Sequence, residues 1–130
     1  MSLMLGTVAV TAFLATTDGS RAKKFYRDVL GLSLVSEDRF ALVFDLNGTE
    51  LRVQKVQELV AQSFTVLGWQ VPDIREAVAE LSRRGVAFER YPSLEQDDHC
   101  IWQAPSGASV AWFEDPDGNV LSVTQRSLRT

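Results

Sequence analysis

The chain has very few of the side chains on which metal and thiol chemistry depend. Its 130 residues include one cysteine, Cys100, and one histidine, His99. A single cysteine excludes an internal disulfide, and a single histidine excludes a metal site built from several imidazoles. The chain does not open with a basic stretch, an apolar run and a small-residue cleavage site, so we expect a cytoplasmic protein.

Long hydrophobic runs and excess positive charge are also missing. No apolar stretch approaches the roughly 20 residues that a membrane-spanning helix needs. Thirteen Lys and Arg residues against 17 Asp and Glu residues give a net charge of −4, the wrong sign for binding nucleic acid by counterion release. With 45% hydrophobic and 23% charged residues, the composition is that of a globular protein whose partners are neither membranes nor nucleic acids.

What the sequence does contain is an internal repeat. Each half shows an apolar strand, a helix, further strands, an acidic turn and then a last strand. The pattern predicts an α+β fold of two βαβββ modules, at about 5–56 and 63–126, within a single domain of residues 1–130. The matching landmarks are first strands at 7–15 and 64–67, helix caps Asp18 and Asp73, helix ends Gly31 and Gly85, and last strands at 51–54 and 121–124.

The helices and turns follow from local signals. After Asp18 the apolar residues recur at helical spacing until Gly31, and the same pattern follows Asp73 until Gly85. Two acidic turns, 45–48 and 115–119, each separate two apolar runs and predict hairpins. The second turn contains too few carboxylates for a calcium loop, so we interpret it as a tight turn.

Two motifs resemble a known superfamily. Asp18 followed by Phe-Tyr-Arg-Asp-Val-Leu-Gly-Leu at 25–32, and Phe-Glu-Asp-Pro-Asp-Gly-Asn at 113–119, are similar to signatures of the vicinal oxygen chelate superfamily. It includes glyoxalase I, bleomycin-resistance proteins, fosfomycin-resistance enzymes and extradiol dioxygenases. The resemblance implies modules that curve into a partly closed mixed sheet around a cavity, with the helices on the convex face. It also implies a homodimer.

The resemblance also marks the positions at which metal-using relatives hold their ion. Counting from the two motifs, these positions are Thr11, Arg52, Val66 and Ser122. Two hydroxyls, an alkyl group and a guanidinium do not suit a divalent ion, which needs imidazole or carboxylate ligands. The sequence therefore predicts no metal site and no cofactor.

The cavity lining follows from strand alternation. If Phe113 points toward the helices, Trp112 and Glu114 point the other way, and Thr11 and Ser122 share the cavity side. Trp102 lies in the segment that lengthens the second module. Aromatic walls with a few polar anchors are typical of small-molecule pockets. Two interpretations stay open, because both tryptophans could instead pack against each other or cover a dimer seam.

Three further residues are candidates for ligand contacts. Arg52 within a curved sheet needs an anionic partner, which could be Glu50, Glu114 or a ligand carboxylate or phosphate, or it faces water at a sheet edge. His99 could act as a general base or be an ordinary loop residue. The sequence leaves these alternatives open.

The leading prediction is a glyoxalase/bleomycin-resistance-like protein that binds a small organic molecule in its cavity without a metal. The alternative is a metal-dependent or metal-free lyase, isomerase or dioxygenase of the same superfamily that uses unorthodox residues such as His99 or Glu50. A third interpretation is an accessory subunit with a filled cavity and an exposed apolar surface.

Overall fold

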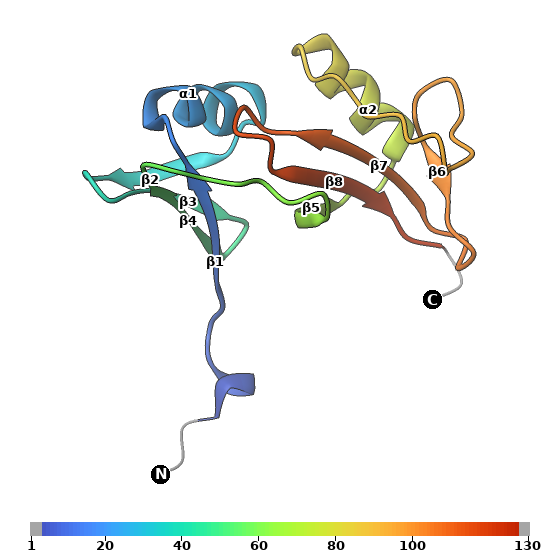
Figure 1. Cartoon of the computed structure of the whole chain (residues 1–130). Coiled ribbons are helices and arrows are strands. Elements are labelled where there is room, and N and C mark those ends of the chain that lie inside the picture. The colour runs from blue at the N-terminus through green and yellow to red at the C-terminus, as the bar shows by residue number, and fades with distance from the viewer. Residues whose placement is uncertain (1–3, 128–130) are drawn as a thin grey trace. The chain divides into compact units, whose positions relative to one another are not determined.

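A computed structural model describes residues 4–127 and confirms the α+β class and the two βαβββ modules. The chain divides into two compact units, Met1–Leu59 and Val60–Thr130, each holding one module (Figure 1). Each unit contains a four-stranded mixed sheet that is open rather than closed on itself. Among residues 4–127, no helix has the length and apolar character required to cross a bilayer. The prediction that one domain surrounds a shared cavity stays a prediction.

In the first unit the sheet has the order β1-β4-β3-β2, in which β1 runs parallel to β4 and the other neighbours are antiparallel. The elements are η1 (Leu5–Thr7), β1 (Thr11–Thr16), α1 (Gly19–Lys23), η2 (Lys24–Val29), β2 (Ser33–Glu37), β3 (Ala41–Leu46) and β4 (Thr49–Lys55).

The first strand is shorter than the sequence predicts. The expected strand at 7–15 is wrong at its start, because Leu5–Thr7 form a single 3-10 turn. The Thr7 N–H and hydroxyl both donate to the Met4 carbonyl, at 3.0 and 2.8 Å. Pairing with β4 begins only at Thr11. The local side-chain bond of Thr7 competes with strand formation at this end.

The first helix begins where expected but changes its winding. Asp18 accepts a hydrogen bond from the Arg21 N–H at 3.1 Å, as an N-cap should. After Lys23 the helix continues as a π-helix over Lys24–Val29, in which the Leu30 N–H donates to the Phe25 carbonyl five residues back. The apolar spacing that predicts an α-helix does not distinguish these two windings.

The first unit has its core between this helix and the sheet. Tyr26 is fully buried, and its ring lies 5.9 Å from that of Phe44, centroid to centroid. The strand residues beneath the helix are equally buried, with 0% exposure for Leu42, Phe44, Leu51 and Val53. The predicted hairpin between β3 and β4 is confirmed, since Asn47 and Gly48 have φ of 52° and 99° and fit a two-residue turn.

In the second unit the sheet has the order β5-β8-β7-β6, in which β5 runs parallel to β8. The elements are β5 (Thr65–Gln70), α2 (Ile74–Arg83), β6 (Trp102–Gln103), β7 (Ser109–Glu114) and β8 (Val120–Gln125). The strand expected directly after the helix is reduced to one bridge between Phe88 and Phe113. The inserted segment supplies β6 in its place.

Helix α2 is held to the sheet at its first turn. The Asp73 side chain accepts a hydrogen bond from the Glu76 N–H at 3.2 Å, which confirms it as the N-cap. The Ile74 N–H donates to Gln125 Oε1 of β8 at 2.9 Å. Ile74 and Val78 are buried on the face of α2 that packs on the sheet. The helix therefore covers the face that carries Leu121, Val123, Ala111 and Phe113, all buried.

The turn between β7 and β8 is the predicted tight turn. Asp115 is 5% exposed, and its Oδ1 accepts the N–H groups of Asp117 and Asn119, both at 2.9 Å. Its Oδ2 accepts a bond from the Asn119 side chain at 2.8 Å. The carboxylate is thus occupied by bonds within the turn. This geometry supports the turn interpretation over a calcium loop.

A close approach of two strands explains one glycine. Gly68 of β5 pairs with Ser122 of β8, and a Cβ at position 68 would lie 2.5 Å from Ser122 Oγ. That distance is shorter than any ordinary contact, so a side chain at this position would displace the serine. Two residues earlier, at Val66, the pairing register shifts by a bulge.

We expect Gly68→Ala to lower the free energy of unfolding by about 1–2 kcal/mol, because the new methyl group overlaps Ser122 Oγ. In a Ser122→Ala background the same substitution should cost less, since the overlapping oxygen is gone. Urea denaturation of the four proteins measures both costs. Gly6→Ala is the matched control, because nothing lies within 4 Å of its added Cβ. Equal costs in the two backgrounds would contradict this account.

Candidate functional site

Each sheet has one face beneath its helix and one open face. Because side chains alternate along a strand, the open faces carry the residues between the buried core positions. In the first unit these include Thr11, Phe13, Glu50 and Arg52; in the second they include Trp102, Trp112, Ser122 and Thr124. Six of the seven predicted ligand-binding residues therefore lie on open faces: three on each unit.

The open face of the first unit brings Glu50 and Arg52 together. Thr11 pairs with Glu50, and Arg52 pairs with Phe13. The Arg52 Nη1 lies 3.8 Å from Glu50 Oε2, and the two side chains are 35% and 47% exposed. An exposed ion pair of this length contributes little to stability. Arg52 thus has a carboxylate partner within the unit, one of the alternatives that the sequence leaves open.

The charge of Arg52 also acts on a second carboxylate, that of Asp38. The N–H groups of Phe40 and Ala41 donate to Asp38 Oδ1, at 2.8 and 3.0 Å, and hold the pKa of this carboxyl below its ordinary value. The positive charges of Arg52 and Lys55 lower that pKa further. Arg52 is therefore balanced by acidic groups of its own sheet, and its contact with an anionic ligand stays a prediction.

The open face of the second unit carries three packed aromatic side chains, which we call the aromatic cluster: Tyr91, Trp102 and Trp112. The rings of Tyr91 and Trp112 lie 5.5 Å apart, edge to face. The rings of Trp102 and Trp112 lie 5.9 Å apart and tilted by 36°. All three side chains remain partly exposed. The two interpretations of the tryptophans are thus compatible, since they pack together and still present a surface to solvent.

The orientation of the Trp112 indole is fixed by a hydrogen bond. Its Nε1 donates to Thr65 Oγ1 at 3.1 Å. Trp112 lies on β7 and Thr65 on β5, so this bond spans the intervening strand β8. Beneath it Val120 and Ser122 are 5% and 7% exposed. A tryptophan held at its polar edge presents its ring face as a rigid wall.

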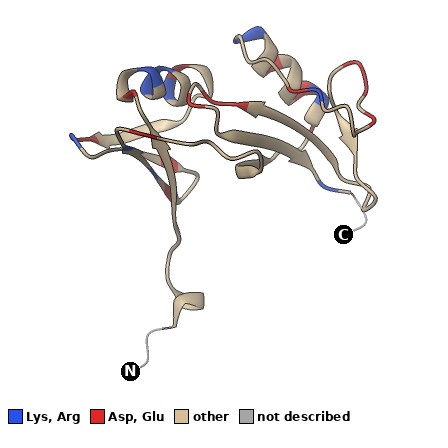
Figure 2. Ribbon diagram, viewed as in Figure 1, with Lys and Arg blue, Asp and Glu red and all other residues tan. Residues whose placement is uncertain are grey.

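The tyrosine of the aromatic cluster sits in an acidic environment. Burial raises the pKa of the Tyr91 phenol above its ordinary value, and the charges of Glu89 and Glu114 raise it further. Negative charges disfavour the phenolate, so Tyr91 stays neutral beyond the usual range. Figure 2 shows acidic residues along the turn after β7 and in the loop before β6, whereas basic residues occur on the helices, at the turn between β2 and β3 and at the end of β8.

His99 lies in the exposed turn before β6. The backbone N–H of His99 donates to Asp97 Oδ1 at 2.8 Å, and the backbone N–H of Ile101 donates to the same oxygen at 3.0 Å. Burial alone would raise the pKa of Asp97, but the two N–H groups hold it below its ordinary value. Asp97 thus has a structural role in this turn, and a chemical role for His99 stays a prediction.

The residues at the family's metal positions do not fit an ion. In the second unit Ser122 is buried against Gly68, and Val66 is an apolar residue at the strand bulge. In the first unit Thr11 is adjacent to the pair formed by Glu50 and Arg52, whose guanidinium repels cations. Residues 4–127 hold no group of three or more His, Cys, Asp or Glu side chains arranged for a metal. Hydroxyl, alkyl and guanidinium groups are poor donors for a divalent ion.

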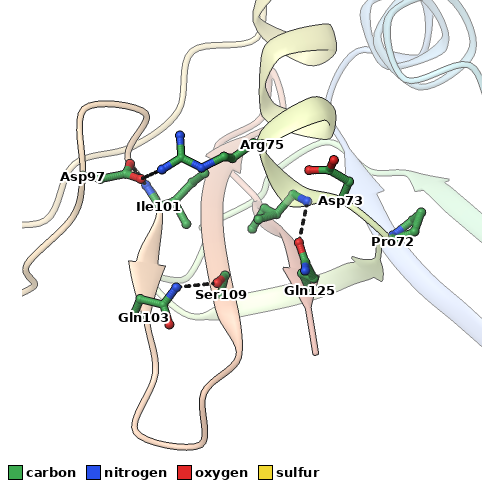
Figure 3. A pocket seen from close by; sticks show the side chains of 9 residues that line it. Pro72, Asp73, Arg75, Asp97, Ile101, Gln103, Ser109 and Gln125 are labelled. Carbon is green, nitrogen blue, oxygen red and sulfur yellow. Dashed lines mark hydrogen bonds and ion pairs between the residues drawn. The ribbon is translucent and has the colours of Figure 1, made fainter. Parts of the chain in front are cut away.

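A polar hollow lies on the other side of the second sheet, at the start of α2 (Figure 3). It has a volume of about 380 Å³ and contains the pair Arg75 and Asp97, whose Nη2 and Oδ2 lie 3.5 Å apart. A neighbouring hollow of about 600 Å³ shares this pair and reaches Trp102. Both are shallow and charged with both signs. The first hollow has no aromatic residue in its lining, and the second has only Trp102 of the aromatic cluster.

Sequence reasoning missed three residues of the open face, and it placed a fourth, Glu114, on the same side as Trp112 without making it a ligand contact. Tyr91, Thr65, Glu89 and Glu114 were not predicted as ligand contacts. For Glu114 the signal is alternation, since it follows Trp112 by two residues on β7. For Glu89 there is no such signal, because only the bond from its N–H to the Trp112 carbonyl places it beside Trp112. For Tyr91 and Thr65 no local signal exists, because the strand register alone brings them to Trp112.

Comparison with known proteins agrees with this architecture. The chain resembles TnmS3, an antibiotic binding protein from Streptomyces sp. CB03234, with 25% identity, a TM-score of 0.73, and coverage of 96% of this chain and 100% of that one. It also resembles a superfamily member from Sphaerobacter thermophilus DSM 20745, with 21% identity, a TM-score of 0.72, and coverage of 92% and 98%.

A third similar structure is a lactoylglutathione lyase from Agrobacterium tumefaciens, with 21% identity, a TM-score of 0.68, and coverage of 92% of this chain and 93% of that one. No curated protein sequence matches the chain. The family model for the Glyoxalase/Bleomycin resistance protein/Dioxygenase superfamily matches residues 6–123, nearly the whole chain. With its two βαβββ modules and this match, the chain belongs to the Glyoxalase/Bleomycin resistance protein/Dioxygenase superfamily.

Proposed function

We propose that this protein binds a small organic molecule on the open face of the second sheet, without a metal ion. The observation that carries the proposal is the aromatic cluster, in which Trp112 is fixed by Thr65 and flanked by Tyr91 and Trp102. Rigid, partly exposed aromatic walls bind planar or apolar ligands with little loss of conformational entropy. The similarity to an antibiotic binding protein supports the same conclusion.

The alternative is an enzyme of the same superfamily. Within the second unit the candidate base is His99, which lies in the exposed turn before β6, where its backbone N–H donates to Asp97 Oδ1. Catalysis by a positioned acid or base requires that group within hydrogen-bond reach of the ligand. Binding without chemistry therefore accounts best for the groups on the open face.

We also propose that the protein is a cytoplasmic homodimer. The first unit exposes several large apolar side chains, including Val10, Phe13 and Phe40 at 69%, 55% and 62%. Large apolar side chains exposed to this extent support a surface that a second copy covers. A reducing compartment suits the free thiol of Cys100.

We expect Trp112→Ala to weaken binding of aromatic ligands about tenfold or more, because it removes the central wall of the aromatic cluster. Ligand-detected NMR with a panel of aromatic metabolites and antibiotics measures the loss. The matched control is Trp69→Phe, since Trp69 pairs with Val123 and belongs to the opposite face of the sheet. If both variants bind alike, Trp112 is not the wall of the site.

The donor set at the family's metal positions predicts weak metal binding. After incubation with Ni²⁺, Zn²⁺, Mn²⁺ or Fe²⁺ and removal of the free ion, the purified protein should retain far less than one equivalent. Plasma emission spectroscopy measures the metal content. A stoichiometric ion that resists dialysis would overturn the metal-free proposal.

For the dimer, light scattering should give about twice the chain mass of 14.5 kDa. Val10→Glu places a charge among the exposed apolar residues of the first unit and should shift the mass toward one chain. A monomeric mass for the unaltered protein at micromolar concentration would reject the dimer.

A further inference from the structure

Two carboxylates border the aromatic cluster on the same face of the sheet. Phe88 bridges Phe113, so Glu89 lies beside Trp112, and the Glu89 N–H donates to the Trp112 carbonyl at 2.8 Å. Glu114 lies two residues beyond Trp112 along β7 and therefore points to the same side. The segment after α2 and strand β7 thus each contribute one acidic side chain next to the rings.

These two carboxylates are not neutralised by a neighbour. Among residues 60–127, neither Glu89 nor Glu114 takes part in an ion pair. The nearest basic residue in the sequence, Arg90, donates from Nη2 to the Asp97 carbonyl at 2.9 Å, and from Nη1 to the Gln96 carbonyl at 3.4 Å. Arg75 pairs with Asp97 instead. The open face therefore holds two uncompensated negative charges.

The charges of Glu89 and Glu114 both act on Tyr91 of the aromatic cluster. After burial, the charges of Glu89 and Glu114 are what raise the pKa of the Tyr91 phenol. The Tyr91 ring in turn contacts Trp112 at 5.5 Å. A ligand stacked on Trp112 would thus lie within the same negative field.

We propose that the ligand of this face is an organic cation, a flat aromatic or quaternary ammonium group that stacks on Trp112 and Trp102 between Glu89 and Glu114. This inference rests on the proposed function and specifies its ligand class. A cation gains from the electron-rich ring faces and from both carboxylates, whereas an anion is repelled by the carboxylates. A small inorganic cation gains less, because aromatic rings do not replace its oxygen ligands.

The test uses three probes of nearly the same shape and different charge: N-methylquinolinium, which is cationic, 1-methylnaphthalene, which is neutral, and 1-naphthoate, which is anionic. Equilibrium dialysis against the unaltered protein measures each affinity. We expect the cation to bind about tenfold more tightly than the neutral probe, and the anion to bind most weakly. Added salt should weaken binding of the cation and leave that of the neutral probe unchanged.

Charge-removing variants assign the effect to residues. Glu89→Gln and Glu114→Gln should each lower affinity for N-methylquinolinium about threefold and leave 1-methylnaphthalene unaffected. Glu76→Gln is the matched control, because it removes the same charge from α2, which covers the opposite face. Circular dichroism confirms that each variant is folded, and the salt dependence of the unaltered protein tests the charge independently of any variant.

The outcomes separate this inference from the proposed function. Equal affinity for the cationic and neutral probes, both lost in Trp112→Ala, would overturn the cation inference and retain the aromatic site. Absence of binding by all three probes, with no effect of Trp112→Ala on the wider ligand panel, would overturn the proposed function itself.

Discussion

The hydrogen bond between Trp112 and Thr65 is the constraint on which the candidate site depends. It crosses β8, and so it exists only when β5, β8 and β7 pair in one register. The side chains beneath this bond must also be small enough to leave room for the indole. Val120 and Ser122 are buried beneath the bond, and Gly68 adds no side chain next to the serine. The indole is thereby held at its edge, with its faces left for the neighbouring rings or a ligand.

The same constraint explains why the second module differs from the first. In the first module the residue opposite Arg52 is Phe13; in the second the residue opposite Ser122 is Gly68. The strand bulge at Val66 brings Thr65 into register with Val120, within reach of the indole. A position that relatives use for metal ligation thus becomes part of the support for an aromatic wall. The first sheet instead presents an exposed ion pair and scattered apolar residues.

The acidic side chains beside the aromatic cluster favour ligands of positive charge. The acidic side chains beside the rings lie on the open face, while the basic residues of the insert are committed to its own backbone, as Arg90 shows by its bonds to Gln96 and Asp97. The net charge of −4 therefore understates the local asymmetry. Long-range attraction of cations and short-range stacking on aromatic rings act together at one place on the surface.

Much of the fold could be predicted from local patterns. Caps at Asp18 and Asp73, the two hairpin turns and the α+β class with its repeat are written in neighbouring residues, because capping and turn formation involve atoms a few positions apart. Two local predictions were wrong in detail. The first strand starts later than expected, and the strand expected after α2 is reduced to one bridge between Phe88 and Phe113. The first helix is confirmed, although apolar spacing does not specify its π-winding over Lys24–Val29.

The sequence by itself determined the family motifs, the scarcity of metal ligands and the placement of Trp112 on the sheet face opposite Phe113. Only the tertiary structure decided which residues surround it. Tyr91 and Thr65 are 21 and 47 positions away in the chain, and they meet the indole because strand register and one bulge align them. Register is set by the packing of a whole sheet, so no short stretch of sequence encodes it.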